Sequence, residues 1–414
     1  MHDSNTDRLS RRALLEIYQA AILAVNGRQA VAQRLRQSPL DGEVSLVAVG
    51  KAAQSMAEGA RDILGERITG GLVISKQGHL DFQHLSETGW ELVEGGHPMP
   101  NRGSLAAGDR LIGFLSLSDQ SPLLFLISGG ASSLVEYPVR GVDQGFLIKA
   151  NDWLLGSGLA INDINLVRKG LSLIKGGGLL RWIDDRPVRA LAISDVPGDA
   201  PEIIGSGLLA PEPGLAMALQ KLDLPAWLRA QLDAGIEERG ALRSEGPEIE
   251  IVANLDLAKQ TAAEKAQAMG YQLRIEPEFI EGDAAENGRR MAEALWQGEP
   301  GVWIWGGETT VRLPRNPGRG GRNQHLALAA AQVLSGRERV WLLSVGTDGT
   351  DGPTEDAGAL VDGDTIRRAR LEGLDAERHL QAADAGSLLE ATGDLITSGP
   401  TGTNVMDLII GLKL

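Results

Sequence analysis

The sequence predicts two α/β domains, the first a Rossmann-like doubly wound sheet, with the active site in the cleft between them. In both halves of the 414-residue chain, short apolar runs alternate with amphipathic helical segments. A polar, loop-rich stretch over about residues 211–247 contains no convincing strand, which predicts domains of residues 1–246 and 247–414. Glycine-rich or charged residues follow most of the predicted strands, where open α/β sheets bind their ligands.

The first half begins with an amphipathic helix, because the apolar residues of MHDSNTDRLSRRALLEIYQAAI recur at helical spacing and form no signal-peptide core. A second helix is expected directly after Gly50-Lys51, and residues 143–183 are expected to be helical. Buried strands are predicted at residues 44–49, 71–75, 90–93, 123–127 and 189–193. This alternation favours the doubly wound sheet.

Alternation resumes after the polar stretch, so the second half is also expected to be α/β. Helices are predicted at residues 255–269, 283–297 and 323–334. Strands are predicted at residues 249–252, 271–276, 301–305 and 309–313, and a further strand is expected to end at Gly346.

Composition excludes several classes of protein. Hydrophobic residues make up 43% of the chain, yet no apolar run approaches the length of a membrane span, so we expect a soluble, cytoplasmic protein without a membrane partner. The absence of cysteine excludes disulfides, thiolate nucleophiles and Cys-ligated zinc. A formal charge of -15 with scattered acidic residues argues against a nucleic-acid partner. Anionic substrates would therefore need local Lys or Arg residues, or a metal ion.

The most informative segment is WLLSVGTDGTDG, residues 341–352, in which a buried strand ends at two aspartates. Asp348 and Asp351 lie among glycines that let the backbone approach a ligand closely. Carboxylates in such a place can hold Mg²⁺ or accept a proton, as phosphoryl transfer requires. The alternative is an ordinary Asp-Gly turn, which the doubled motif makes less attractive.

Two loops offer cations near predicted helix starts. Lys51 stands where free N–H groups and the helix dipole favour an anion, although a solvated surface lysine is an equal alternative. The loop NPGRGGRNQH places Arg319 and Arg322 among glycines ahead of a helix. The planar fork of arginine matches phosphate or carboxylate oxygens, whereas the alternative is an exposed basic turn.

Further polar residues have the positions expected of ligand contacts. Asn165, Arg168 and Lys169 share a predicted helix, whose polar face is equally compatible with solvent. The other candidates lie in loops, most of them after predicted strands: Ser128, Gly129, Gly130, Asp195, Gly306, Gly307, Glu308, Thr401 and Asn404.

Several enzyme motifs are missing. The sequence contains no GxxxxGK[ST] loop and no GxGxxG after a strand, which argues against a Walker-type ATPase and an ordinary nicotinamide-binding fold. It has no protein-kinase HRD or DFG set and no HExxH spacing among its six histidines.

Taken together, the motifs resemble the class II glycerate kinases, the glycerate 2-kinase family whose carboxyl-terminal domain is called MOFRL. The resemblance runs through nearly the whole chain: VAVGKAA, GHPMPN, ISGGASSL, INLVRKGLSLIKGGGL, SDVPGDAPEIIGSG, GGETTV, GRGGRNQ, GTDGTDGPTEDAGALVD and TSGPTGTNVMDL. It implies transfer of the γ-phosphoryl group from ATP, with Mg²⁺, to the 2-hydroxyl of D-glycerate. Similar proteins also carry the label hydroxypyruvate reductase, an NAD(P)H-dependent alternative for which the sequence has no nicotinamide fingerprint.

The resemblance also assigns roles to residues of this chain. Lys51 matches the lysine of GKAA, Arg322 the second arginine of GRGGRNQ and Asp348 the first aspartate of GTDGTDG, so these three are the expected catalytic residues. The candidates listed above for loops and helix, with Arg319, are expected to bind glycerate or ATP. Expected metal ligands are Asp195, Asp348 and Asp351. A homodimer is a further expectation. The sequence departs from the usual family motifs at Ala131, Leu208, His325 and Met406.

Overall fold

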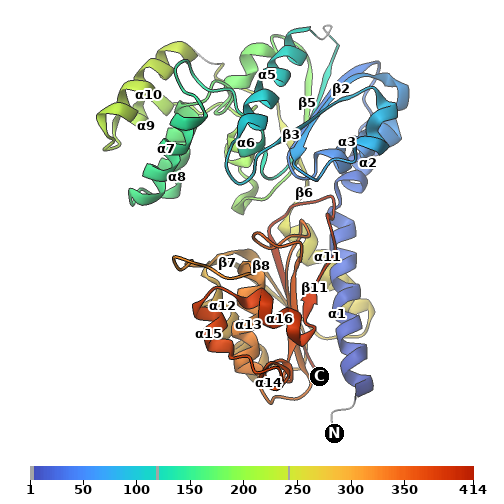
Figure 1. The fold of residues 1–414 in the computed structure, drawn as a ribbon. Helices are drawn as coiled ribbons and strands as arrows, with labels where there is room; N and C mark the ends of the chain where they lie inside the picture. Colours follow the sequence, from blue (N-terminus) through green and yellow to red (C-terminus); the bar gives the residue numbers. More distant parts are fainter. Residues whose placement is uncertain (1–3, 118–120, 241–242) are drawn as a thin grey trace. The chain divides into compact units, whose positions relative to one another are not determined.

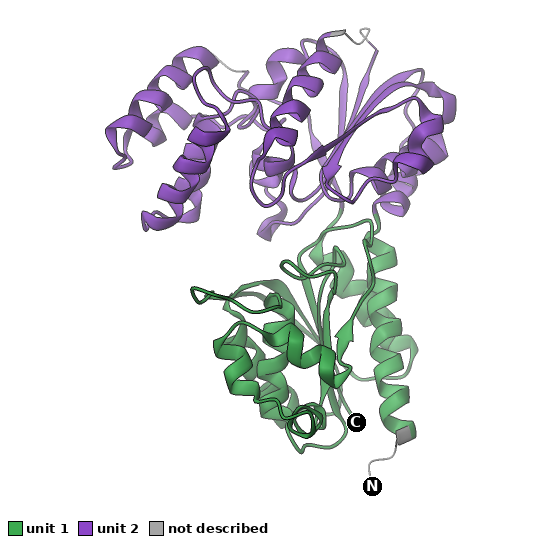
Figure 2. Cartoon of the chain, in the orientation of Figure 1, with its two compact units in different colours: residues 1–26, 253–414 green, residues 27–252 purple. Residues whose placement is uncertain are grey.

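The computed structural model describes residues 4–117, 121–240 and 243–414. The chain forms two compact units (Figure 2): unit 1 comprises residues 1–26 and 253–414, and unit 2 comprises residues 27–252. Each unit contains one six-stranded sheet with helices, which confirms the predicted α/β class. The first 26 residues pack with the carboxyl-terminal half, an arrangement that division of the chain at residue 246 did not anticipate.

The sheet of unit 2 has the strand order β3-β2-β1-β4-β5-β6, which is that of the dinucleotide-binding fold. Neighbouring strands from β3 to β5 are parallel, so their carboxyl ends share one edge. The order reverses between β1 and β4, where such sheets place their ligands. The strands are β1 (Val44–Val49), β2 (Ile68–Lys76), β3 (Glu91–Gly95), β4 (Leu123–Ile127), β5 (Val188–Ile193) and β6 (Ile249–Ala253).

Helices lie on both faces of this sheet (Figure 1). On one side are α2 (Gly27–Gln37) and α3 (Ala53–Leu64); on the other are α5 (Arg102–Leu117) and the short α6 (Ala131–Leu134). Residues at alternate positions of β1, such as Val47 and Val49, belong to the core under α5 and α6. A short helix, α4 (Phe82–Leu85), precedes β3. With helices on both faces, the central strands β1 and β4 are buried along their whole length, as the sequence indicated.

A second cluster of helices has its own apolar core within unit 2. It contains α7 (Gln144–Gly156), α8 (Ile161–Gly170), α9 (Leu215–Gln220) and α10 (Ala226–Arg239) (Figure 1). The predicted helical region of residues 143–183 is thus divided: α7 and α8 are followed by a buried turn and the 3₁₀ segment Gly178–Trp182. The three consecutive glycines explain the break, since Gly176 and Gly177 have φ of 56° and 76°.

The sheet of unit 1 is mixed, with the order β11-β10-β9-β12-β8-β7. Only β7 and β8 are parallel neighbours among the pairs described, and the other pairs are antiparallel. The strands are β7 (Leu273–Asp283), β8 (Gly301–Thr310), β9 (Val340–Gly346), β10 (Gly358–Asp362), β11 (Leu395–Ile396) and β12 (Asp407–Lys413). The strand predicted at residues 249–252 is present, but as β6 it extends the sheet of unit 2.

Two expectations for residues 301–313 are wrong. Thr309–Leu313 is not a separate strand, because β8 continues without interruption to Thr310. For the same reason Gly306-Gly307-Glu308 is part of a strand rather than a loop after one. The glycines serve close packing: a Cβ at Gly307 would lie 2.0 Å from the carbonyl oxygen of Ile280 on β7.

Helices cover the two faces of the unit 1 sheet. One core joins the sheet to α12 (Ala284–Gln297), α13 (Arg322–Leu334), α14 (Thr365–Leu371), α15 (Ala376–Gln381) and α16 (Ala385–Thr392). The other face carries α1 (Ser4–Val25) and α11 (Leu255–Ala268), which lie side by side (Figure 1). The buried apolar stripe of α1, with Leu14, Ile17 and Val25, accounts for its place in unit 1.

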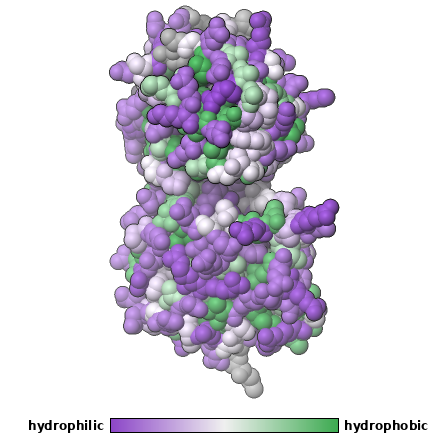
Figure 3. Space-filling view, turned by 90° about the vertical axis from the view of Figure 1, so that its left-hand side faces the viewer, coloured by the Kyte–Doolittle hydropathy of each residue, from purple (hydrophilic) through white to green (hydrophobic). Residues whose placement is uncertain are grey.

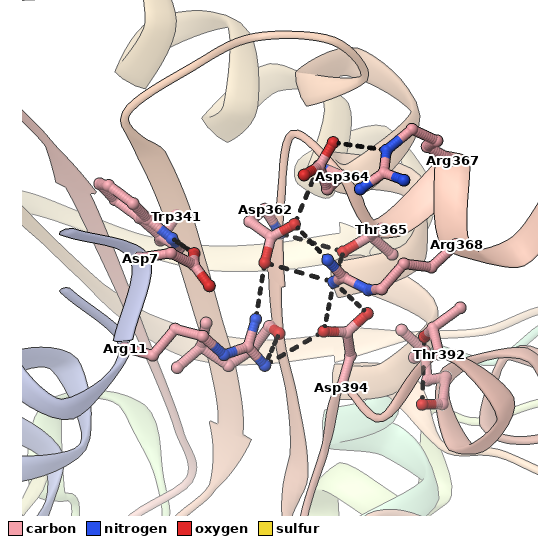
Figure 4. A network of polar contacts seen from close by, with 12 residues as sticks. Asp7, Arg11, Trp341, Asp362, Asp364, Thr365, Arg367, Arg368, Thr392 and Asp394 are labelled. Atoms are coloured by element: carbon pink, nitrogen blue, oxygen red, sulfur yellow. Dashed lines mark hydrogen bonds and ion pairs between the residues drawn. The ribbon is translucent and has the colours of Figure 1, made fainter. Parts of the chain in front are cut away.

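A buried ionic network also holds α1 (Figure 4). Arg11 donates to Asp362 at 2.7 Å and to Asp394 at 3.1 Å, and Arg368 contacts the same two carboxylates. The indole N–H of Trp341 donates to Asp7 at 2.6 Å. Two guanidinium groups therefore compensate two buried carboxylates, at the end of β9 opposite to the Asp348 loop.

The surface shows no extended apolar patch on the face drawn in Figure 3, where hydrophilic side chains cover most of both units. Among the helices of the described residues, none has the length and apolar character needed to cross a membrane.

The network leads to a stability prediction. Arg11→Met should lower the free energy of unfolding by about 2 kcal/mol, because Asp362 and Asp394 would share only one cation. Chemical denaturation measures this loss. The matched control is Arg12→Met, because Arg12 is exposed and its pair with Glu16 is worth less than about 1 kcal/mol. Equal losses in the two variants would contradict the assigned role of the network.

Candidate functional site

In unit 2, the carboxyl ends of β1 and β4 meet at the point where the strand order reverses. We call the contact between Gly50 and Ser128 at this point the strand crossing. The amide of Lys51 donates to the carbonyl of Gly129 at 2.9 Å, and the amide of Ser128 donates to Val49. Gly50 has a φ of 131°, and a Cβ there would lie 2.1 Å from the hydroxyl oxygen of Ser128. Only glycine fits this crossing, so the residue before Lys51 is dictated by backbone packing.

Three residues with distinct chemistry meet beside this crossing. A Cβ at Gly130 would lie 3.2 Å from the ring of His97 and 3.3 Å from the side chain of Lys51. Gly130 has a φ of 82°, so its bare Cα keeps a space open between the imidazole and the lysine stem. Lys51 is half-buried in the turn before α3. The edge thus presents a cation and an imidazole where a doubly wound sheet holds anionic ligands.

The other strand-end candidates differ in exposure. The Ser128 side chain is fully buried, and its oxygen accepts a hydrogen bond from the amide of Ala52 at 3.0 Å, so it shapes the turn. Asp195 lies two residues after the end of β5, at the same edge of the sheet, and is half-buried. The structure therefore brings Lys51, the glycines after β4 and Asp195 to one edge, as predicted from the parallel arrangement.

The polar residues of α8 have different partners. Lys169 is buried and pairs with Glu212, so its ammonium serves the fold. Arg168 donates to Asn151 at 2.5 Å and to Asn165 at 3.4 Å. Burial lowers the pKa of Arg168. The sequence treated these neighbours alike, but only Arg168 lacks a carboxylate partner among the described residues.

In unit 1, Asp348 lies in the tight turn that follows β9. One of its carboxylate oxygens accepts from the amide of Thr350 at 3.0 Å and from its hydroxyl at 3.1 Å. A Cβ at Gly349 would lie 2.0 Å from the carbonyl of Gly399, so this turn packs directly on the loop before β12. Thr401 ties the same two loops together through the carbonyl of Thr347 at 2.5 Å. The carboxylate is thereby held in one orientation.

Asp351 caps a helix. Its two carboxylate oxygens accept from the amides of Asn323 and Gln324 at 3.0 and 2.8 Å, in the first turn of α13. Burial raises the pKa of Asp351 to about 7, although the two backbone hydrogen bonds act in the opposite direction. The doubled motif therefore combines two tasks, because Asp351 orients α13 while Asp348 stands in the turn.

Arg322 is held by two carboxylates rather than facing an open site alone. It forms a bidentate pair with the buried Asp407, at 2.7 and 3.0 Å, and contacts the half-exposed Glu308 at 2.7 Å. Burial lowers the pKa of Arg322, but the charge and hydrogen bonds of Asp407 outweigh burial and raise it. An incoming oxyanion would compete with Glu308 and leave the Asp407 pair intact.

The remaining candidates of unit 1 lie in the glycine-rich loop, in β8 and in the loop before β12. Arg319 pairs with Asp356 at 2.8 Å and Glu390 at 2.5 Å, which ties its glycine-rich loop to α16. Gly306 and Gly307 lie inside β8. Asn404 is buried in the loop before β12, close in sequence to Thr401.

Sequence reasoning missed two residues of this region. Asp407 had a signal, an acidic residue at the head of the apolar run DLIIGL, which requires a buried counter-ion. For Tyr18 of α1, the sequence contained no such signal. Its buried hydroxyl makes no well-formed hydrogen bond within the described residues. Burial raises the pKa of Tyr18 to about 12, the Ser398 hydroxyl lowers it, and the negative charge of Asp348 raises it, which places the phenol near the turn.

Few side chains of the described residues are placed to hold a metal ion. Among the described residues no group of three or more His, Asp or Glu side chains is placed to hold one. Mg²⁺ needs only one or two carboxylates when substrate phosphates and water complete its shell. Asp348 fits that requirement, whereas both oxygens of Asp351 already accept helix amides.

Two family models match the chain. Residues 13–230 match a domain of unknown function, DUF4147, and residues 301–407 match the MOFRL family. The chain is 38% identical to the D-glycerate 2-kinase of Thermotoga maritima, over 97% of this chain and 98% of that protein. It is 33% identical to the glycerate 2-kinase of Pyrococcus horikoshii, over 91% and 89% of the two chains.

Two further comparisons bear on function and fold. A putative hydroxypyruvate reductase of Agrobacterium vitis is 35% identical, over 97% of this chain and 94% of its own. The crystal structure of glycerate kinase from Thermotoga maritima superposes with a TM-score of 0.84 at 35% identity, covering 98% of this chain and 100% of that chain.

The strand crossing predicts a severe effect of one methyl group. Gly50→Ala should destabilise unit 2 by about 3 to 5 kcal/mol, as the sum of backbone strain and a clash with Ser128. The control is Gly89→Ala, which has a φ of 70° but open space around its Cα, and should cost about 1 kcal/mol. Denaturant titration distinguishes the two, and comparable losses would refute the crossing as the constraint.

The Arg322 pair predicts that its removal impairs folding. Arg322→Met should lower the free energy of unfolding by about 2 to 4 kcal/mol, since Asp407 would be buried without a counter-ion. Glu308→Gln should change it by less than about 0.5 kcal/mol, because Glu308 is half-exposed and its ion pair is screened by solvent. Thermal unfolding of both variants tests this. A stable Arg322→Met variant would show that Asp407 is compensated by other groups.

Proposed function

This chain belongs to the glycerate 2-kinase family with a MOFRL domain, and we propose that it transfers the γ-phosphoryl group of ATP to the 2-hydroxyl of D-glycerate, giving 2-phosphoglycerate and ADP. The observation that carries this proposal is the position of Lys51 at the point where the strand order of the unit 2 sheet reverses. Lys51 directly follows Gly50, a position that only glycine can occupy. A cation at that place suits a phosphorylated or carboxylated ligand.

Lys51 acts by charge. Its ammonium group, supported by the amino-terminal end of α3, neutralises oxygen atoms of the transferring phosphoryl group or of the substrate carboxylate. The chain carries a formal charge of -15, so a local cation is needed to bind two anionic substrates. His97 and the glycines after β4 border the same space and limit its size.

Asp348 acts on the hydroxyl. In the proposed reaction the 2-oxygen of glycerate forms a bond to the γ-phosphorus, the bond from that phosphorus to the β-γ bridging oxygen breaks, and the hydroxyl proton passes to the Asp348 carboxylate. Thr350 holds one oxygen of this carboxylate, which fixes its direction. Arg322 supports charge neutralisation through the nitrogen now paired with Glu308.

Mg²⁺, when bound, neutralises the phosphate oxygens of ATP. Asp195 is the carboxylate proposed to hold it, and Asp348 would hold it only in the alternative in which Asp348 does not take the hydroxyl proton. Asp351 contributes through its cap on α13. The remaining predicted contacts, from Asn165 and Arg168 in unit 2 to Thr401 and Asn404 in unit 1, are proposed to bind the substrates. A cytoplasmic location and a homodimer remain predictions, and light scattering measures the latter.

The hydroxypyruvate reductase name of similar proteins defines the competing activity. The unit 2 sheet has a strand order found in dinucleotide-binding proteins. Its first turn nevertheless reads Gly50-Lys51-Ala52-Ala53, without the three glycines that bring the backbone to a pyrophosphate. The kinase reaction is therefore the better-supported proposal.

The decisive experiment combines both activities. The full chain should consume ATP only when D-glycerate and Mg²⁺ are present, and the product should carry phosphorus on the 2-oxygen by NMR. Lys51→Met and Asp348→Asn should each lower kcat/KM by about 10²- to 10⁴-fold. Asp348→Asn preserves the acceptor for Thr350, so its fold should be retained.

Lys221→Met is the matched control, because Lys221 is an exposed lysine of the same unit. Its activity should equal that of the unmodified chain, and thermal unfolding should be similar in all four proteins. Oxidation of NADH by hydroxypyruvate without ATP, together with no glycerate-dependent ATP consumption, would replace the kinase proposal with the reductase.

A further inference from the structure

Unit 2 contains a small cavity outside the strand crossing. Its volume is about 70 Å³, which has room for a few non-hydrogen atoms. One wall is apolar and comes from α7, with Leu147, Ala150 and Leu154. The polar part of the lining includes Ser132, Ser133, Asn151 and Arg168. An apolar wall with a few convergent polar groups is the usual composition of a small-ligand site.

The charges around this cavity do not balance. Glu136 and Lys175 both line it, but they form a buried ion pair, and the hydroxyl of Ser172 also donates to Glu136. Arg168 lines it too, and its hydrogen bonds go only to the amide oxygens of Asn151 and Asn165. Among the described residues no carboxylate pairs with it. The cavity therefore contains one cation more than its carboxylates neutralise.

A half-buried guanidinium without an anion is unfavourable, because desolvation is not repaid by an opposite charge. The neutral amide of Asn151 repays only part of this cost. A carboxylate ligand would satisfy the planar fork of Arg168, which presents parallel N–H donors. The site is thus built for an oxyanion that arrives from outside.

We propose that this cavity binds the carboxylate group of the small hydroxy acid substrate, with Arg168 as its counter-ion. The assignment rests on the proposed kinase function, which supplies the hydroxy acid. The apolar wall suits the carbon atoms of a three-carbon acid, and the hydroxyls of Ser132 and Ser133 can serve its own hydroxyl groups. The limited volume disfavours a nucleotide.

Two short segments connect the cavity with the Lys51 region. Ser132 lies two residues after Gly130, and Pro98 lies directly after His97. Gly130 and His97 are the residues that approach the Lys51 side chain. The same two segments therefore border both places, so a hydroxy acid anchored at Arg168 is bound next to the cation proposed for the reacting groups.

The test uses Asn151→Asp, which adds one charge without changing the shape of the side chain. The new carboxylate would pair with Arg168 and exclude the substrate carboxylate, while the fold keeps or gains stability. Titration calorimetry of the full chain with D-glycerate, without ATP, should show Kd raised about 10- to 100-fold in Asn151→Asp and in Arg168→Gln. KM for glycerate should rise likewise, with kcat changed far less.

Asn162→Asp is the control, because it adds the same charge to an exposed position on α8, and its Kd should equal that of the unmodified chain. ATP should bind all four proteins with Kd values within about twofold. If Arg168→Gln fails to fold, Asn151→Asp decides alone. Unchanged glycerate affinity in Asn151→Asp would overturn the proposal, as would weakened ATP or inorganic phosphate binding with glycerate binding unaffected.

The outcome also separates this proposal from the proposed function. Glycerate-dependent ATP consumption with unchanged KM in Asn151→Asp and Arg168→Gln would uphold the kinase and overturn the cavity assignment. Arg168-dependent binding of glycerate without any ATP consumption would uphold the carboxylate site and reject the kinase reaction.

Discussion

The compensation of two buried carboxylates at the start of α13 is the constraint on which the site of unit 1 depends. Asp407 begins β12 and Asp351 follows β9, and neither is exposed to solvent. Arg322 neutralises Asp407, the amides of the next two residues hold Asp351, and the side chain of Asn323 donates to Asp407 at 2.9 Å. One helix end thus fixes the turn between β9 and Asp351, and with it the place of Asp348.

Unit 2 compensates its buried cations differently, through ion pairs and hydrogen bonds distributed along one segment. Lys169 pairs with Glu212, Lys175 with Glu136, and the fully buried Arg239 donates to backbone carbonyls of residues 169, 172, 175 and 176. Burial lowers the pKa of Arg239 to about 10. These cations hold the turn after α8 closed. Arg168 differs from the two lysines in lacking a carboxylate partner among the described residues, and from Arg239 in lining the cavity that is proposed to bind the substrate carboxylate.

How far the sequence predicted this structure depends on the range of each interaction. The strands β1 and β4 were predicted to the residue, because a buried parallel strand is a short apolar run with local boundaries. The strands β10 and β12 were not predicted, although each contains a short apolar run; only their antiparallel pairing with β9 lacks a local signal. The sequence predicts a loop at the glycines of β8, because glycine occurs both in turns and where two strands pack closely. Likewise, the carboxylate paired with Arg322 lies 85 residues away.

The departure at Met406 shows why the site backbone tolerates a change in sequence. Met406 has a φ of 70°, in the left-handed region that the asparagine of the usual family motif adopts more easily. The strain costs about 1 kcal/mol or more and persists only where neighbouring contacts over-determine the backbone. Thr347 supplies those contacts: its amide and hydroxyl both donate to the carbonyl of Met406, and its hydroxyl oxygen accepts from the amide of Val405. The loop before β12 is therefore shaped by the residue preceding Asp348, so the side chain at position 406 can vary while the turn that presents the carboxylate is retained.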